Sequence, residues 1–311
     1  MNLSQKSLSM SRWKNKLLFF SMSLLLIAGL GYIDRTFFKR NSSFCIRFLY
    51  SCLPSNPKWD LPFLPKEEAS HLDEILNQKF YYLAKGAHCY AFISEDKQYV
   101  IKFHRYPSHM RLFPWLNRPF AYQFEERRKK IKEYNIQRLC ASFQSYQESY
   151  LQLKEETGLI LLHINPTDNL HKTITLVDKT QATYRVPLDK VTFILQHKAD
   201  LIYPTLDKLM QENRIDEAKD TVSSIVRLIT TCCQKGYVDE DPVLRKNYGL
   251  LAGRAIHIDI GSFVKNEEMK HKKNYIPHVK EMTESLRQRL EKNYAALLDH
   301  YHQEIEGLLE K

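Results

Sequence analysis

Residues 247–263 read NYGLLAGRAIHIDIGSF, and this stretch decides the fold prediction for the whole chain. Two short apolar runs flank the tight turn AGR at 252–254, a pattern that predicts a β-hairpin. Asn247 lies just before the first run, and the second run ends in Asp259-Ile-Gly. Because the two arms of a hairpin pair with each other, Asn247 and Asp259 are expected to lie close together although they are twelve residues apart.

The composition is that of a globular protein with an excess of positive charge. The chain has 311 residues, 43% of them hydrophobic and 26% charged, enough for one large domain or two small ones. Its net charge of +10 indicates an acidic partner such as phosphate, nucleic acid or an anionic membrane face. The basic runs at 127–132 and 270–273 are interpreted as solvated helix faces. Since the sequence has no zinc spacing, RNA-binding signature or regular repeat, no nucleic acid is expected as a partner.

The six cysteines favour a reducing compartment. They form no CxxC pair, and Cys232 and Cys233 are adjacent in a predicted helix, where a mutual disulfide would be strained. Only Cys45 and Cys52 could pair, across a short loop. The pattern predicts that the soluble domain is cytoplasmic.

An uncharged, mostly apolar run covers residues 17–33, behind the basic N-terminus 1–16. Its 17 residues are the lower limit for a bilayer span of about 17 to 25 residues. We expect a retained single-pass transmembrane helix or signal-anchor, with the membrane as a partner. A cleaved signal peptide is the alternative, with Ala28, Gly29 and Gly31 as the small residues near its end. Basic residues on both sides leave the orientation open. The proline-containing residues 34–70 are interpreted as a tether.

The pattern after residue 70 predicts a strand-rich region followed by a helical one. Three strands are expected over 79–103, a charged helix over 124–149, further strands over 158–164 and 191–196, and a hairpin over 173–189. In the second region, a short helix and then a long one with apolar residues at three- and four-residue spacing are expected, the long one ending at Gly236. A final helix carries an apolar stripe from Met282 to Leu308.

This order of elements resembles that of the protein-kinase-like superfamily, in its atypical, compact bacterial form. The resemblance covers about residues 79–263. It implies an α+β, two-lobed fold behind the N-terminal transmembrane helix, with an antiparallel-sheet N-lobe over 71–196 and a reduced helical C-lobe over 197–311. A catalytic-type loop over 237–263 lies in the C-lobe. No Ala-Pro-Glu follows Gly261, so the peptide-binding half of eukaryotic protein kinases is missing or replaced.

The resemblance also implies site residues. Asp259 resembles the aspartate of the DFG motif and Asn247 the asparagine of the catalytic loop, which implies that both bind Mg²⁺. Lys102, in YVIKF, resembles the strand lysine that contacts the phosphates of ATP. Gly86 is the single glycine where kinases have a glycine-rich loop. Gln196, in ILQHK, falls where the adenine-contacting hinge is expected.

Two positions stay open between alternatives. The catalytic aspartate of kinases lies five residues before the metal-binding asparagine, a place that Pro242 holds here. Asp241 needs one extra residue in the loop and Asp239 needs three, so Asp241 is the first candidate for the base and Asp239 the second. Arg245 or Lys246 could stabilise charge on the transferred group. The helix glutamate that pairs with the lysine is one of Glu125, Glu126 and Glu133, of which Glu133 lies deepest in the helix.

The expected function is Mg-ATP-dependent phosphoryl transfer by a membrane-anchored kinase-like protein to a hydroxyl of a protein, a sugar or a lipid headgroup. A pseudokinase, or nucleotide-binding scaffold without turnover, is the alternative that the single glycine and the displaced aspartate favour. A membrane-tethered interaction protein, whose C-terminal helix pairs with a partner, is the second alternative.

Overall fold

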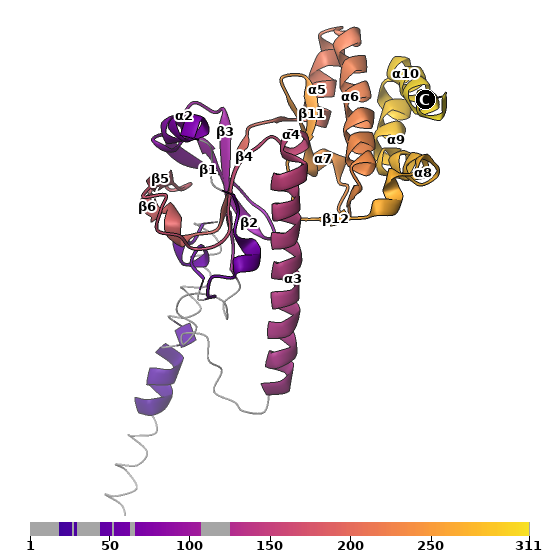
Figure 1. Ribbon diagram of the computed structural model, residues 1–311. Helices are drawn as coiled ribbons and strands as arrows, with labels where there is room; N and C mark the ends of the chain where they lie inside the picture. Colours follow the sequence, from indigo (N-terminus) through magenta and orange to yellow (C-terminus); the bar gives the residue numbers. More distant parts are fainter. Residues whose placement is uncertain are drawn as a thin grey trace, which may run out of the picture.

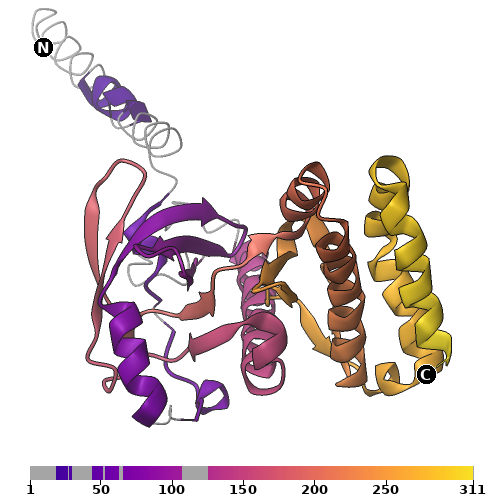
Figure 2. The ribbon, with the colours of Figure 1, turned by 90° about the horizontal axis from the view of Figure 1, so that it is seen from above.

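The computed structural model describes residues 19–26, 28–29, 44–51, 53–62, 66–106 and 125–310. A strand-rich part and a helical part lie side by side, with the long helix α3 (Glu125–Gln152) running between them (Figure 1). Seen from above, the same two parts stay separate and the small hairpins of the helical part face the strand-rich part (Figure 2).

The expected transmembrane helix over 17–33 is wrong. Across the described part of the chain, no helix has both the length and the apolar composition needed to cross a membrane. The prediction of a single-pass membrane location is overturned with it.

The strand-rich part is a seven-stranded sheet with the strand order β4-β7-β3-β2-β1-β5-β6. Neighbouring strands pair antiparallel except β1 and β5, which are parallel, so the expected antiparallel sheet is corrected to a mixed one. After β3 the chain passes through α3 to β4, at one edge of the sheet, and then crosses to the far side of β1, where β5 lies parallel to it. The strands are β1 (Lys79–Lys85), β2 (Cys89–Ser94), β3 (Tyr99–His104), β4 (Leu159–His163), β5 (Thr173–Val177), β6 (Thr183–Pro187) and β7 (Phe193–His197).

The pleat of β2 and β3 separates a core face from a cleft face. Phe92 and Phe103 are fully buried on the core side. Alternate residues, among them Ala91 and Lys102, point to the opposite side, because successive side chains of a strand alternate. Phe44 and Leu49 also pack into the core of the sheet at 2% and 0% exposure. That part of the expected tether over 34–70 therefore belongs to the folded body.

Five further helices belong to this region. Three precede β1: η1 (Ile46–Phe48), η2 (Pro57–Trp59) and α2 (Lys66–Leu76). The other two are α4 (Lys154–Thr157), before β4, and η6 (Leu188–Lys190), before β7. The C-terminal half of α3 joins the core of the helical part through Leu139, Phe143 and Tyr146, whereas Ile131 and Tyr134 in its N-terminal half are exposed.

The helical part is built on α6 (Ile215–Gln234), whose apolar face carries the expected three- and four-residue spacing. Gly236, just beyond its end, has φ +82, as the helix-ending pattern predicts. The other helices are α5 (Ile202–Gln211), α7 (Leu244–Asn247), η7 (Glu267–Lys270), α8 (Lys272–Met282), α9 (Glu284–Asn293) and α10 (Ala295–Glu310). Two small sheets complete it, β11-β10-β8 and β12-β9.

The expected final helix is in fact three helices. Thr283, between α8 and α9, is fully buried, and its hydroxyl donates to the carbonyl of Val279 at 2.7 Å and contacts the Tyr301 hydroxyl at 2.8 Å. The apolar stripe is nevertheless buried in each piece. Because the spacing continues across the breaks, the pattern could not reveal them.

The hairpin of residues 247–263 forms as expected. β10 (Tyr248–Leu251) pairs antiparallel with β11 (Arg254–His257), while β8 (Asp200–Leu201) pairs with the other edge of β10. Ala252 and Gly253 make the turn with φ +47 and +79, the two positive values of the tight turn that suits a twisted hairpin. The chain then continues through β12 (Phe263–Lys265), which pairs with β9 (Tyr237–Asp239).

Candidate active site

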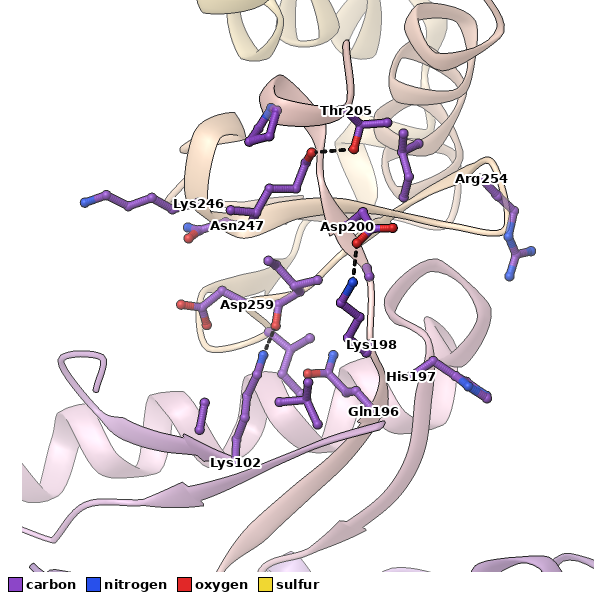
Figure 3. Close-up of a pocket in the computed structure, with 18 of the residues that line it drawn as sticks. Lys102, Gln196, His197, Lys198, Asp200, Thr205, Lys246, Asn247, Arg254 and Asp259 are labelled. Atoms are coloured by element: carbon purple, nitrogen blue, oxygen red, sulfur yellow. Dashed lines mark hydrogen bonds and ion pairs between the residues drawn. The ribbon is translucent and has the colours of Figure 1, made fainter. Parts of the chain in front are cut away.

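A cleft of about 1720 Å³ opens between the two parts of the molecule. Its walls are the β1–β2 turn, the cleft faces of β2 and β3, the connection after β7, α5, α6 and the loop on either side of the β10–β11 hairpin. Figure 3 shows Lys102 reaching across it from the sheet, with Asp259 and Asn247 opposite.

Lys102 is the cation on the sheet side. Its ammonium group donates a hydrogen bond to the backbone carbonyl of Ile258, the residue before Asp259 (Figure 3). Burial lowers the pKa of Lys102, while Asp259 acts in the opposite direction. A partly buried ammonium that faces a carboxylate is suited to an anionic ligand, because the ligand replaces the water that the charge has lost.

Asn247 and Asp259 are joined through the backbone. The carbonyl of Asn247 accepts from the amide of Ile258 at 2.7 Å and from that of Asp259 at 3.4 Å. This pair of contacts continues the hairpin by one step beyond β10 and β11. It explains why residues twelve apart in sequence lie one above the other on the same side of the cleft (Figure 3).

The orientation of the Asn247 side chain follows from its partners. Nδ2 donates to the backbone carbonyl of Asp241 at 2.7 Å and faces the Asp241 carboxylate at 3.3 Å. Both partners are acceptors, so the amide nitrogen must face them and the side-chain oxygen must face away. Asp259 is exposed, and its Oδ1 accepts from the Gly261 amide at 3.2 Å. An amide oxygen and a carboxylate are hard ligands of the kind that Mg²⁺ prefers.

Asp241 and Asp239, the two candidates for the base, have different surroundings. Asp241 is exposed and lines the cleft beside Asn247. Asp239 is 4% exposed and lies behind the cleft wall. The geometry therefore brings Asp241, but not Asp239, to the place where a substrate could reach it.

Asp239 is a structural centre of the loop. Its carboxylate accepts from the Ser262 hydroxyl at 2.6 Å, the Asp241 amide at 2.9 Å and the Tyr248 hydroxyl at 3.3 Å, and lies 3.6 Å from His257 Nδ1. Burial acts to raise the pKa of Asp239, but these partners outweigh it and the pKa is lowered. Asp239 therefore ties β9, the end of β11 and the segment after Gly261 into one unit.

Ser145 on α3 fixes the other side of that segment. Its hydroxyl donates to the carbonyl of Ile260 at 2.7 Å and accepts from the amide of Phe263 at 2.7 Å. The Asp-Ile-Gly segment is thus held by α3 from one side and by Asp239 from the other.

The β1–β2 turn over Gly86 is compact. The Gly86 amide donates to the carbonyl of Cys89 at 2.9 Å and is used within the turn. The Arg105 guanidinium donates to the carbonyls of Gly86 and Ala87 at 2.8 and 3.2 Å. The turn therefore offers few backbone amides to a ligand, although Gly86, Ala87 and His88 all line the cleft.

Gln196 lies on the cleft wall at the end of β7 and is 2% exposed. Its Nε2 donates to the carbonyl of Thr157 at 2.9 Å, and its Oε1 is buried without a partner among the described residues. Ala199, in the connection that follows β7, lies against Gly249 of β10. A Cβ added to Gly249 would lie 2.7 Å from the Cβ of Ala199. The glycine therefore permits the approach of β10 to the connection between the two parts.

The structure does not bring Glu133 to Lys102. Glu133 is exposed, and the side chains of α3 that line the cleft are Arg138, Ser142 and Tyr146. Among the described residues, no glutamate forms an ion pair with Lys102.

Arg138 and His257 were not predicted from the sequence. For Arg138, the available signal was the spacing of residues 138, 142 and 146 on one helix face.

No protein-family model and no curated protein matches the sequence. Among solved structures, the chain is similar to the bifunctional kinase-methyltransferase WbdD, with 15% identity, coverage of 70% of this chain and 43% of that one, and a TM-score of 0.31. It is also similar to the Rv3197–erythromycin complex from Mycobacterium tuberculosis, with 14% identity, 97% and 75% coverage and a TM-score of 0.32. ROP2 from Toxoplasma gondii, a virulence factor with a protein-kinase fold and no enzymatic activity, gives 12% identity, 67% and 63% coverage and a TM-score of 0.31.

The chain spans less than half the length of the WbdD structure. At TM-scores near 0.3 these superpositions are too loose to support a function. The fold assignment rests on the chain itself: a mixed sheet with an inward lysine, a long helix, and a helical part whose hairpin ends in Asp-Ile-Gly opposite that lysine. This is an α+β fold whose order of elements resembles that of the protein-kinase-like superfamily.

Proposed function

We propose that the protein is a phosphotransferase that binds ATP with Mg²⁺ in the cleft and transfers the γ-phosphoryl group to a hydroxyl. The observation that carries this proposal is the contact between the Asn247 carbonyl and the amides of Ile258 and Asp259. It gathers an amide oxygen, a carboxylate and the Lys102 ammonium group at one end of a large cleft, and phosphoryl transfer needs positioned charges of this kind.

Apolar side chains of the cleft suit an adenine ring. Val100 from the sheet, which pairs with Gln196, and Leu250 from β10 line it at 8% and 7% exposure, together with Ile194, which pairs with Lys102. A flat apolar slot that buries most of a ring, with a few polar groups at its end, is typical of small-molecule sites. Lys102 would then contact the phosphates.

The metal would be held by the Asn247 side-chain oxygen and the Asp259 carboxylate. The described residues contain no cluster of three or more His, Cys, Asp or Glu side chains suited to a metal. Two protein ligands are few, and Mg²⁺ is commonly completed by waters and substrate phosphates. When bound, the ion supplies positive charge that offsets the charge of the phosphate oxygens.

Asp241 would accept the proton of the acceptor hydroxyl as its oxygen attacks the γ-phosphorus. The bond from that phosphorus to the bridging oxygen then breaks and ADP leaves. Asp241 is suited because it is exposed in the cleft and adjoins the Asn247 amide at 3.3 Å. Lys246 also lines the cleft and would stabilise charge on the transferred group, whereas Arg245 does not line it.

The first test is nucleotide binding to the full chain, measured by thermal unfolding with ATP in the presence and in the absence of Mg²⁺. Ligand at a hundred times its dissociation constant adds about 2.7 kcal/mol to stability. We expect a shift that depends on Mg²⁺ in the wild type and in the control Asp220→Asn, which removes a carboxylate elsewhere in the same cleft. In Asp259→Asn the Mg²⁺-dependent part should disappear. No ATP-dependent shift in folded wild-type protein would rule the proposal out.

A nucleotide-binding protein without turnover is the second candidate. It is supported by α3, whose cleft face offers Arg138, Ser142 and Tyr146 and no carboxylate to pair with Lys102. A Mg²⁺-dependent shift with ATP, but no release of ADP and no labelling of sugar, lipid or protein hydroxyls from [γ-³²P]ATP, would favour this candidate.

A further inference from the structure

A small cavity of about 60 Å³ lies beside the main cleft, between the β1–β2 turn and α3. Its walls are His88, His104, Arg105, Asn135, Arg138, Leu139 and Ser142. His88, Arg138 and Ser142 line the main cleft as well, so the two spaces adjoin. One water needs about 10–15 Å³ measured in this way, so the cavity has room for a larger polar group.

We infer that this cavity is a binding site for a phosphate oxyanion, held between Arg105 and Arg138. Two guanidinium groups line it and no carboxylate does. Guanidinium groups bind phosphate through paired, charge-assisted hydrogen bonds. The site does not depend on phosphoryl transfer in the main cleft, and no role in that reaction is needed for it to bind.

Arg105 is held in place before any ligand arrives. Its Nη1 donates to the carbonyls of Gly86 and Ala87, and its guanidinium lies over the ring of Tyr90 at 4.9 Å. Its Nε is buried without a partner among the described residues. A buried N–H without an acceptor costs free energy, and an oxyanion in the adjoining cavity would provide the acceptor.

Arg138 has spare donors on the opposite wall. Its Nη2 lies 3.0 Å from His88 Nε2, and the structure gives its guanidinium no carboxylate partner among the described residues. Burial and the nearby arginines lower the pKa of His88, so a neutral imidazole accepts from Arg138. Among the described residues the other N–H groups of Arg138 have no hydrogen-bond partner, so they can donate to an anion.

His104 adds a buried polar atom to this wall. It is 4% exposed, and its Nδ1 is buried without a partner among the described residues. Burial lowers the pKa of His104 to about 3, so the ring is neutral at physiological pH and can donate one hydrogen bond. Asn135 and Ser142 add two neutral polar groups to the same wall.

The oxyanion has two possible sources, free phosphate or the terminal phosphate of a nucleotide in the adjoining cleft. We would measure the binding of inorganic phosphate to the full chain by calorimetry, at constant ionic strength, in the wild type, Arg138→Met and Arg227→Met. Arg227 is an exposed arginine on α6 that lines the main cleft but not the small cavity, which makes it a matched control. Loss of one charge-assisted hydrogen bond should weaken binding about tenfold or more.

Phosphate binding that falls in Arg138→Met and is unchanged in Arg227→Met supports the site with free phosphate as the ligand. If free phosphate does not bind, ATP and AMP are compared without Mg²⁺. A selective loss of ATP affinity over AMP affinity in Arg138→Met then assigns the site to the nucleotide. Equal effects of the two substitutions, or no effect of Arg138→Met on phosphate or ATP, would overturn the inference. The phosphate measurement contains no nucleotide, so its result is independent of the proposed phosphotransfer.

Discussion

The carboxylate of Asp239 lies 3.6 Å from Nδ1 of His257, and both side chains are 1% exposed. This distance is that of an ion pair and is slightly longer than a hydrogen bond. His257 is two residues before Asp259, and Asp239 is two residues before Asp241. The buried pair therefore fixes the start of both segments that supply cleft carboxylates.

We predict that Asp239→Asn lowers the free energy of unfolding. The variant removes a buried charge that His257, Ser262 and Tyr248 surround, and leaving such donors poorly paired costs about 1–3 kcal/mol. Urea unfolding monitored by circular dichroism measures this. A variant as stable as the wild type would mean that Asp239 does not hold the loop together.

The same variant should change the pH dependence of stability. The pKa of Asp239 is lowered in the folded protein, so its contribution is present above the unfolded value of about 3.9 and is lost as the pH falls through the folded value. The difference in stability between wild type and Asp239→Asn should therefore be constant near pH 6 and shrink below about pH 4. A difference that grows on acidification would contradict the assigned direction.

Asp241→Asn should act on rate and leave stability nearly unchanged. Asp241 is exposed, and removing a general base lowers turnover by about 10²–10⁴-fold. ATP affinity should stay within about twofold, because the backbone carbonyl of Asp241, which holds the Asn247 amide at 2.7 Å, is kept in the variant. Single-turnover kinetics and calorimetry on the same preparation separate the two effects. Loss of stability together with rate would assign Asp241 a structural role instead.

Lys102→Met should weaken ATP binding more than AMP binding. The substitution keeps the length of the side chain and removes the charge that faces the Asp259 segment, so the loss is about tenfold or more for a ligand with three phosphates. Lys208→Met is the control, since Lys208 is exposed and lines the cleft on α5. Equal loss in both variants would indicate only a general effect of charge.

Two glycine substitutions should have opposite effects. In Gly249→Ala the new Cβ would lie 2.7 Å from the Cβ of Ala199 and 3.0 Å from the carbonyl oxygen of Asp200, an overlap that costs about 1–3 kcal/mol. In Gly307→Ala the Cβ meets nothing within 4 Å in helix α10, and alanine should stabilise that helix by up to about 1 kcal/mol. Thermal unfolding of both variants tests the close approach of β10 to the cleft wall.

β2 and the long α6 were predictable from the sequence because each has one buried face with a regular period. β3, β4 and β7 are buried at nearly every position and were predictable as short apolar runs. The same is true of the hairpin: the turn Ala252-Gly253 and the apolar arms are local signals, and local signals place Asn247 opposite Ile258. The parallel pairing of β1 with β5 was not predictable, since the register between distant strands is decided by the path of the intervening helix.

The site residues were predictable where a short sequence motif marks them. They were not predictable where the packing of a helix decides which side chains face the cleft. Lys102 and Asp259 stand in short motifs, and the structure brings their segments into contact through Ile258. Glu133 was expected at Lys102 because charge and helix position were the available information. The rotation of α3 decides which side chains face the cleft, and it turns Arg138 inward instead. The N-terminal run failed as a membrane prediction because its length was at the limit and hydropathy alone had to decide.

The two hydrogen bonds of Ser145 make the Asp-Ile-Gly segment part of the scaffold. Each buried bond contributes about 0.5–1.5 kcal/mol, so swinging the segment out would cost roughly 1–3 kcal/mol from these bonds alone. A conformer with Asp259 turned away would then be populated at roughly 1 to 15 per cent, by the usual relation between free energy and population. In most molecules the Asp-Ile-Gly segment would therefore hold Asp259 toward the cleft before any ligand arrives.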